Sequence, residues 1–238
     1  MIKVITFDLW NTLFLNKSYM DIRLDFFIQF LKKKNKFSSY DKICHAFNSA
    51  FHLSDIYFED NNFRHIYTHE RILRLLNIIN IELSRSEIIE LQIKFEEMML
   101  TDPPPLIFSV KETLNELSKD YIIGLISNTG ITPGRVIKKV FQKYDIQKYF
   151  KITLFSDETG FFKPNPIMFE TILKEFNCIP QNAIHIGDKL ETDVKGAKDC
   201  KMFTIWINDS NSLKSEEILP DYEIQKIYDV VKIVKDIP

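Results

Sequence analysis

Four polar side chains stand directly after apolar, strand-like stretches of the chain. Asp8 follows the first such stretch, Ser127 follows the second, and Lys163 and Asp188 come after the third and fourth. A carboxylate beside an amine and a hydroxyl could act as a nucleophile in group transfer, and two carboxylates together could hold a divalent cation. Each residue alone is more often a turn or surface residue, so the chemistry depends on whether the fold brings the four together.

The order of the predicted elements supports such a convergence. A short run rich in β-branched and aromatic residues, Val4 to Phe7, predicts a first buried strand. After residue 104 the pattern alternates between helix and strand, with strands predicted at 121–126, 152–155, 183–186, 203–207 and 222–224. This alternation predicts an α/β fold in which helices cover both faces of a parallel sheet. Because parallel strands end at one shared edge, the four polar groups should meet there.

A helical block separates the first strand from the others. Four helices without an intervening strand are predicted at 19–34, 39–53, 63–79 and 84–100, and three consecutive prolines after Asp102 end the block. We expect a small four-helix bundle, with the phenylalanines of the first two helices, Phe26, Phe27, Phe30, Phe47 and Phe51, as its own core. The predicted division is a core of residues 1–15 and 104–238 and a helical insertion of residues 16–103.

Composition excludes several classes of protein. The chain has 238 residues, of which 45% are hydrophobic, and a formal net charge of -2, so neither nucleic acid nor a membrane surface is favoured as a partner. The three cysteines are widely spaced, which argues against a disulfide framework and against a cysteine metal site. The chain shows neither a signal-peptide pattern nor a long apolar stretch. We therefore expect a cytoplasmic protein.

The four stretches that carry Asp8, Ser127, Lys163 and Asp188 resemble the four ordered motifs of the haloacid dehalogenase superfamily. The helical insertion after the first strand is similar too, so the resemblance covers essentially the whole chain. It implies a Rossmann-like catalytic core closed by an α-helical cap. It also implies a hydrolase that acts on a small-molecule substrate, expected to be phosphorylated.

The resemblance also implies roles for individual residues. Asp8 would be the nucleophile and would form a covalent aspartyl intermediate that water breaks down. Ser127, with the backbone amides after it, and Lys163 would stabilise the transferring group, and Lys163 would neutralise charge on the nucleophile. Contacts to the phosphate would come from Thr12, Ser127, Asn128 and Lys163.

A Mg²⁺ site is implied by the same resemblance. Asp8, Asp188 and the backbone carbonyl of Trp10 would hold the ion in the oxygen-rich shell that it prefers. Asp193 would support these ligands from behind. The cation would be the protein's cofactor.

Trp10 departs from the pattern of the family's phosphatases, which have a second aspartate at this position. That aspartate protonates the leaving group and later activates water, and an indole cannot do either near neutral pH. General acid-base catalysis contributes about 10²- to 10⁴-fold. A phosphatase with Trp10 should therefore be slow, restricted to good leaving groups, or helped by a group from the cap or the substrate.

Two alternatives to a phosphatase stay open. An aromatic residue at position 10 is similar to the 2-haloacid dehalogenases of the family, which attack carbon and need no acid there. Those enzymes work without metal and carry an arginine early in the cap, whereas Asp188 resembles the metal-binding phosphatases and Arg23 is not a clear match. The other alternative is a protein that binds a phosphorylated ligand and turns it over weakly.

The polar residues of the predicted third helix leave the cap's specificity open. His65 and His69 are four residues apart, but the sequence places no third metal ligand, so a partly exposed polar face is expected. Three arginines on this helix could meet an anionic substrate or could pair with acidic neighbours at the surface. The arginines are Arg64, Arg71 and Arg74, and the acidic neighbours are Glu59, Asp60 and Glu70.

Overall fold

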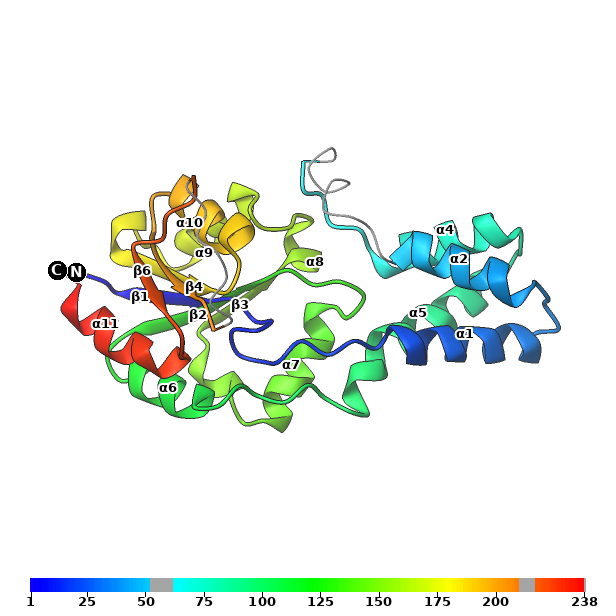
Figure 1. Ribbon diagram of the computed structural model, residues 1–238, viewed down its shortest axis with the longest axis horizontal. Coiled ribbons are helices and arrows are strands. Elements are labelled where there is room, and N and C mark those ends of the chain that lie inside the picture. The colour runs from blue at the N-terminus through cyan, green and yellow to red at the C-terminus, as the bar shows by residue number, and fades with distance from the viewer. Residues whose placement is uncertain (52–61, 210–216, 238) are drawn as a thin grey trace.

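A computed structural model describes residues 1–51, 62–209 and 217–237 (Figure 1). Six parallel strands form one sheet in the order β3-β2-β1-β4-β5-β6. Their bounds are β1 Val4–Phe7, β2 Ile122–Ser127, β3 Ile152–Phe155, β4 Ala183–Gly187, β5 Phe203–Ile207 and β6 Tyr222–Ile224. The strand order reverses beside β1, so a crevice for ligands is expected where β1 and β4 end.

Helices cover both faces of this sheet, as the sequence predicts. Alternate residues of β1 point to opposite faces, since Phe7 belongs to one apolar cluster and Val4 to another. The Phe7 face is covered by α6 (Val110–Leu117), α7 (Gly134–Lys143) and α11 (Val230–Asp236). The Val4 face is covered by α9 (Pro166–Glu175) and α10 (Lys195–Asp199). The predicted Rossmann-like α/β fold is confirmed.

Four further helices extend from the carboxyl side of the sheet (Figure 1). They are α1 (Met20–Lys33), α2 (Tyr40–Phe51), α4 (Thr68–Ile79) and α5 (Arg85–Glu97). They enclose an apolar cluster of their own, in which Phe95 makes edge contacts with Phe27, Phe47 and Phe51 at centroid distances of 5.6 to 6.5 Å. We call this group the cap; its limits at residues 16 and 103 stay a prediction. Among the described helices, none is both long and apolar enough to cross a membrane.

The third cap helix differs from its prediction, because α4 begins at Thr68 and not at residue 63. The preceding residues run extended beside a loop of the core. The backbone amide of His65 donates to the carbonyl of Gly160 at 2.7 Å, and that of Phe162 donates to Phe63 at 2.6 Å. These long-range bonds satisfy backbone groups that would otherwise favour a helix, and they are not visible as a local pattern.

The other predicted boundaries lie within two residues of those observed, with short helical turns included. The second cap helix ends at Phe51 in the described chain, and its predicted end at Leu53 lies outside the described residues. Before α10 the chain makes a wide π-type turn, Leu190–Val194, where the sequence predicts ordinary helix from Asp193. A one-turn helix, α8 (Ser156–Thr159), follows β3.

Candidate active site

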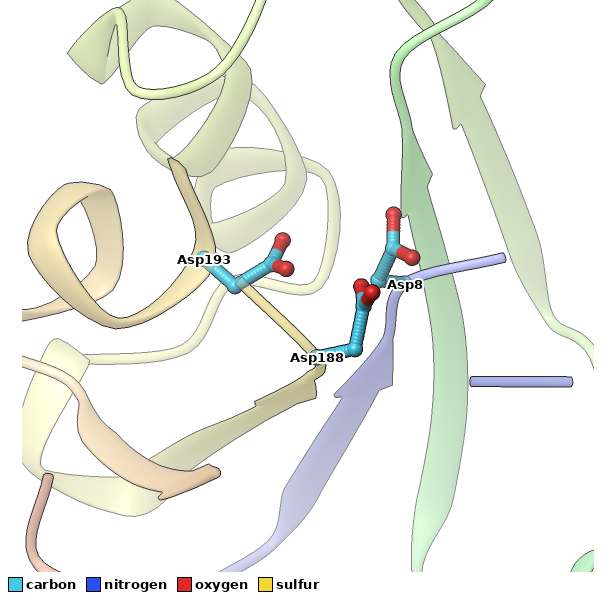
Figure 2. A group of neighbouring side chains, drawn as sticks. All are labelled: Asp8, Asp188 and Asp193. Carbon is cyan, nitrogen blue, oxygen red and sulfur yellow. The ribbon is translucent and has the colours of Figure 1, made fainter. Parts of the chain in front are cut away.

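Three carboxylates meet at the carboxyl edge of the sheet. Figure 2 shows Asp8 and Asp188 side by side at the ends of the neighbouring strands β1 and β4, with Asp193 approaching from the turn after β4. Each offers a carboxylate oxygen, and these oxygens lie within 4.8 Å of one another. The amide of Asp8 donates to the carbonyl of Ile186 at 2.8 Å, which continues the strand pairing and fixes the position of Asp8.

Lys163 joins two of these carboxylates. Its ammonium Nζ lies 2.6 Å from Asp8 Oδ1 and 2.6 Å from Asp193 Oδ1, and it donates to the carbonyl of Ile126 at 2.8 Å. Burial lowers the pKa of Lys163, but Asp193 and Asp8 together outweigh it and hold this pKa above its usual value. Lys163 is therefore a cation whose charge is already balanced inside the protein.

Asn128 positions the backbone of Lys163. Its side-chain Oδ1 accepts from the Lys163 amide at 2.7 Å, and its Nδ2 donates to the Lys163 carbonyl at 3.1 Å. Both ends of this side chain are thus used within the protein. The predicted phosphate contact of Asn128 would have to come from its backbone amide.

Asp193 is held from behind by two further donors. Its Oδ2 accepts from the amide of Lys189 at 3.0 Å, and its Oδ1 lies 3.3 Å from His185 Nε2. Gly187 permits this approach, since a Cβ at that position would lie 2.3 Å from Asp193 Cγ. Burial raises the pKa of Asp193, but Lys163 and His185 lower it more, so the carboxylate stays ionised. Both its oxygens face protein donors.

Asp8 and Asp188 have the opposite electrostatic character. Burial raises the pKa of Asp8 to about 7; Lys163 opposes this shift, and Asp193 and Asp188 add to it. Burial and then Asp193 raise the pKa of Asp188 to about 6, while a 3.3 Å hydrogen bond from Asn11 Nδ2 lowers it. Two crowded carboxylates that resist ionisation fit a hard divalent cation, because the cation would relieve their repulsion.

A cavity of about 650 Å³ opens above these residues. Its wall combines core and cap, with Asp8, Lys163 and Asp188 on the core side and Phe63 and Arg71 on the cap side. This volume suits a small-molecule ligand.

Two residues predicted to contact the phosphate do not reach the described part of the cavity wall. Ser127 and Thr12 are fully buried and are not among the described residues that line it. Within the described chain, Thr12 Oγ1 has no hydrogen-bond partner, whereas Ser127 Oγ makes a 3.4 Å bond to the carbonyl of Asn128. Their assigned roles stay predictions.

Trp10 lines the cavity at the position where an acid is expected. Its indole Nε1 donates to the carbonyl of Asn128 at 3.2 Å, so its one polar atom holds the loop after β2. An indole fixed in this way gives the wall an apolar surface and supplies no acid.

The histidines and arginines of the predicted third cap helix differ in exposure, where we expected a partly exposed polar face for the two histidines. His65 precedes α4 and is buried, with Nδ1 3.1 Å from Ser156 Oγ, whereas His69 is exposed. Arg64 forms a 2.7 Å surface ion pair with Glu70, as one alternative predicted. Arg71 is buried on the cavity wall. Its predicted partners Glu59 and Asp60 lie outside the described residues.

Sequence reasoning missed two lysines on the wall, Lys189 and Lys195. Lys189 directly follows Asp188 and Lys195 lies two residues after Asp193, so their closeness in sequence to these predicted site residues was the available signal.

Comparison with known proteins agrees with this architecture. A family model described as haloacid dehalogenase-like hydrolase matches residues 2–201. A 2-haloacid dehalogenase from Pseudomonas syringae pv. Tomato DC3000 has a similar structure, with a TM-score of 0.74, 22% identity and 99% of each chain covered. At that identity the likeness shows the fold alone.

Sequence relatives include a glyceraldehyde 3-phosphate phosphatase from Pyrococcus furiosus, 36% identical over 99 residues, which cover 40% of this chain and 39% of that enzyme. A phosphoserine phosphatase from Thermus thermophilus is 29% identical over 82 residues, covering 34% of this chain and 33% of that enzyme. The chain thus spans less than half the length of these relatives. The family match covers most of the chain, and the protein belongs to the haloacid dehalogenase-like hydrolases.

Proposed function

We propose that this hydrolase cleaves small phosphate monoesters in a Mg²⁺-dependent reaction through an aspartyl-phosphate on Asp8. The observation that carries the proposal is the ammonium of Lys163, 2.6 Å from both Asp8 and Asp193, on the sheet edge that also presents Asp188. A nucleophile, a fixed cation and further carboxylates at the floor of one cavity are the groups that phosphoryl transfer needs.

In this mechanism a carboxylate oxygen of Asp8 attacks phosphorus. The new oxygen–phosphorus bond forms as the bond to the ester oxygen breaks, and the departing alkoxide takes a proton from solvent. Water then attacks the phosphorus of the aspartyl-phosphate, which releases inorganic phosphate and restores Asp8. Lys163 orients Asp8 and favours its ionised form, and Asp193 keeps Lys163 in place.

Mg²⁺ would be held by Asp8, Asp188 and the carbonyl of Trp10, and it would neutralise charge on the phosphoryl group. Asp188 suits this role because it lines the cavity and, within the described ranges, its carboxylate accepts one hydrogen bond, from Asn11 at 3.3 Å. Asp193 suits a supporting role, since both its oxygens are bonded to protein donors.

Trp10 gives this phosphatase a preference among leaving groups. An alkoxide that must depart without an acid leaves slowly, whereas a phenolate needs no proton. We therefore expect aryl phosphates to be hydrolysed much faster than alkyl phosphates.

The names of the sequence relatives support phosphoryl chemistry, since they include phosphatases of glyceraldehyde 3-phosphate and phosphoserine. The dehalogenase alternative draws support from Trp10. Against it, Arg23 does not lie among the described residues of the cavity wall, so it is not placed to hold a haloacid carboxylate. Its guanidinium donates instead to Phe95 and Thr132.

The test is release of inorganic phosphate from p-nitrophenyl phosphate and from alkyl phosphates, with and without Mg²⁺, and halide release from 2-chloropropionate. We expect Mg²⁺-dependent phosphate release that Asp8→Asn abolishes. Halide release without metal would establish the dehalogenase. Binding of Mg²⁺ and phosphate esters without turnover would establish the ligand-binding alternative.

A further inference from the structure

Arg71 is a buried cation on the cap side of the cavity. Its side chain lies in the first turn of α4, and the residue is 5% exposed. Among the described residues, its hydrogen-bond partners are two backbone carbonyls, Ile66 at 3.4 Å and Phe51 at 3.3 Å. Both bonds are long. Burial lowers the pKa of Arg71 to about 10, so the guanidinium is still charged near neutral pH.

The carboxylate of Glu70, the residue before Arg71, bonds to other groups and not to the Arg71 guanidinium. Glu70 accepts from Arg64 at 2.7 Å and from the amide of Tyr67 at 2.8 Å. It therefore acts as an ion-pair partner at the surface and as a cap of α4. A buried guanidinium without a bonded carboxylate is unfavourable for folding, because the loss of hydration is not repaid.

The start of α4 is fixed against the core, which places Arg71 over the site. Thr68 Oγ1 donates to the carbonyl of Ile131 at 2.9 Å, in the loop that follows β2. That loop also carries Asn128 and Gly130, which line the cavity together with Asp8 and Arg71. A ligand on Asp8 therefore shares one cavity with Arg71.

Arg23 provides an internal comparison. It is also in the cap, 4% exposed, with a pKa lowered to about 10 by burial. Its guanidinium, however, donates at 3.0 Å to Thr132 Oγ1 and at 3.0 Å to the carbonyl of Phe95, and it lies over the ring of Tyr19. Arg23 thus joins cap to core, which is a structural reason for its burial. In the part of the chain that the structure describes, Arg71 makes no hydrogen bond to the core.

We propose that Arg71 determines specificity by binding a second anionic group, a carboxylate or a second phosphate, of the phosphate ester whose first phosphate reacts at Asp8. A guanidinium presents paired donors that match a planar or tetrahedral oxyanion, and its attraction is strong in a site with little water. This inference rests on the proposed function. It names the substrate class as small phosphate esters with two anionic ends.

The test compares substrates that share one carbon skeleton and one reacting phosphate. Glycerol 3-phosphate, glyceraldehyde 3-phosphate and 3-phosphoglycerate differ at C1, which is an alcohol, an aldehyde or a carboxylate. We expect 3-phosphoglycerate to have a kcat/KM about 10- to 100-fold above that for glycerol 3-phosphate, the value of one charge-assisted contact. A comparison of kcat/KM for propane-1,3-diol bisphosphate and for propane-1,3-diol monophosphate tests in the same way whether the second anionic group can be a phosphate.

Substitutions then assign the preference to Arg71. Arg71→Gln should reduce the ratio of the two kcat/KM values about 10- to 100-fold, mainly through KM, and Arg71→Lys should restore part of it. Arg74→Gln, at an exposed position of α4, and Arg23→Gln, which removes a buried cap arginine away from the cavity, should leave the ratio unchanged. A wild-type ratio near one for both pairs, or a ratio that Arg71→Gln leaves intact, would overturn the proposal.

A binding measurement separates this proposal from the proposed function. Calorimetric titration of 3-phosphoglycerate and glycerol 3-phosphate into Asp8→Asn, with and without Arg71→Gln, needs no turnover. If no assay detects phosphatase activity but the titration shows a preference for 3-phosphoglycerate that depends on Arg71, the proposed function is rejected and the anion site is retained. If the enzyme is an active phosphatase but binds the two esters equally, the proposed function is retained and the anion site is rejected.

Discussion

Among the described residues of the cavity wall, two are buried cations, one from the core and one from the cap, and they differ in what balances their charge. On the core side, Lys163 contacts the carboxylates of Asp8 and Asp193, and these raise its pKa. On the cap side, Arg71 contacts two backbone carbonyls, and burial lowers its pKa to about 10. The charge of Lys163 is thus balanced by carboxylates before any ligand binds. The guanidinium of Arg71 has no bonded carboxylate among the described residues, so an anionic ligand could balance its charge.

Because of this difference, we expect the core side and the cap side of the cavity to have separate functions. Groups on the core side should set the rate for every phosphate ester, since each ester places the same reacting phosphate there. Groups on the cap side should set the choice among esters, since they meet the part of the substrate that varies. The two classes of group are separable because a rate effect and a ratio of kcat/KM values are different measurements.

The largest expected effect is that of Asp8→Asn. An amide is a poor nucleophile, so kcat should fall about 10⁴-fold or more for all substrates, with the fold intact. The check is phosphate release from p-nitrophenyl phosphate and 3-phosphoglycerate, with circular dichroism as the control for folding. A variant that retained activity would remove Asp8 from the mechanism. If kcat fell for only one of the two substrates, the expectation that core-side groups set the rate for every phosphate ester would be wrong.

Lys163→Met and Arg71→Met test the two cations by stability. Loss of Lys163 leaves Asp8 and Asp193 buried without their partner, and breaking a buried ion pair costs about 3 to 5 kcal/mol. Loss of Arg71 removes a buried charge and two long hydrogen bonds, so its expected cost is about 1 kcal/mol or less. Urea unfolding at pH 7 without metal measures both. Equal destabilisation by the two substitutions would show that Arg71 is structural.

Trp10→Asp tests whether the missing acid limits the rate. The aspartate would protonate the leaving alkoxide, so kcat for alkyl phosphates should rise about 10- to 100-fold, within the usual range for acid-base catalysis. Aryl phosphates should gain less. Because Trp10 acts at the reacting phosphate, the ratio between 3-phosphoglycerate and glycerol 3-phosphate should not change. A folded variant without any gain would mean that protonation of the leaving group is not limiting.

The core side of the cavity was largely predictable from the sequence. Asp8, Lys163 and Asp188 follow apolar strands of a parallel sheet, and such strands end at one edge whatever their side-chain partners. A short apolar run rich in β-branched and aromatic residues is a local signal, so short segments predict the strand of Val4 to Phe7 and the strand of Ile152 to Phe155.

The cap side could not be predicted in the same way. Three arginines lie within eleven residues, and nothing local tells a buried one from an exposed one. Their environments depend on the extended pairing of residues 63–65 with residues 160–162 and on the bond from Thr68 to Ile131. The burial of His65 against Ser156 has the same origin. These contacts join segments about 60 to 100 residues apart, which hydrophobic periodicity does not detect.

The smallest expected effect is a change in the pKa of His65, which depends on the charge of Arg71. Burial lowers the pKa of His65 to about 4; Asp157 and Glu70 oppose the shift, and Arg71 and Arg64 add to it. An unfolded histidine has a pKa near 6.5, so acid protonates the unfolded chain first. As pH falls from 7 to 5.5, the free energy of unfolding should drop by about 1 kcal/mol, and further down to about pH 4. His65→Gln should remove this contribution.

Arg71→Met should then raise the pKa of His65 and reduce the further drop in the free energy of unfolding below about pH 5, because a nearby positive charge no longer disfavours the imidazolium. The pKa is measured by NMR titration of the His65 ring, with the exposed His45 of α2 as an internal reference. The same titration in Lys163→Met is the matched control, because Lys163 is balanced by two carboxylates and should have little effect at His65. If Arg71→Met left the pKa of His65 unchanged, the charge of Arg71 would already be neutralised at rest. Arg71 would then resemble Lys163, and the proposed anion site would lose its physical basis.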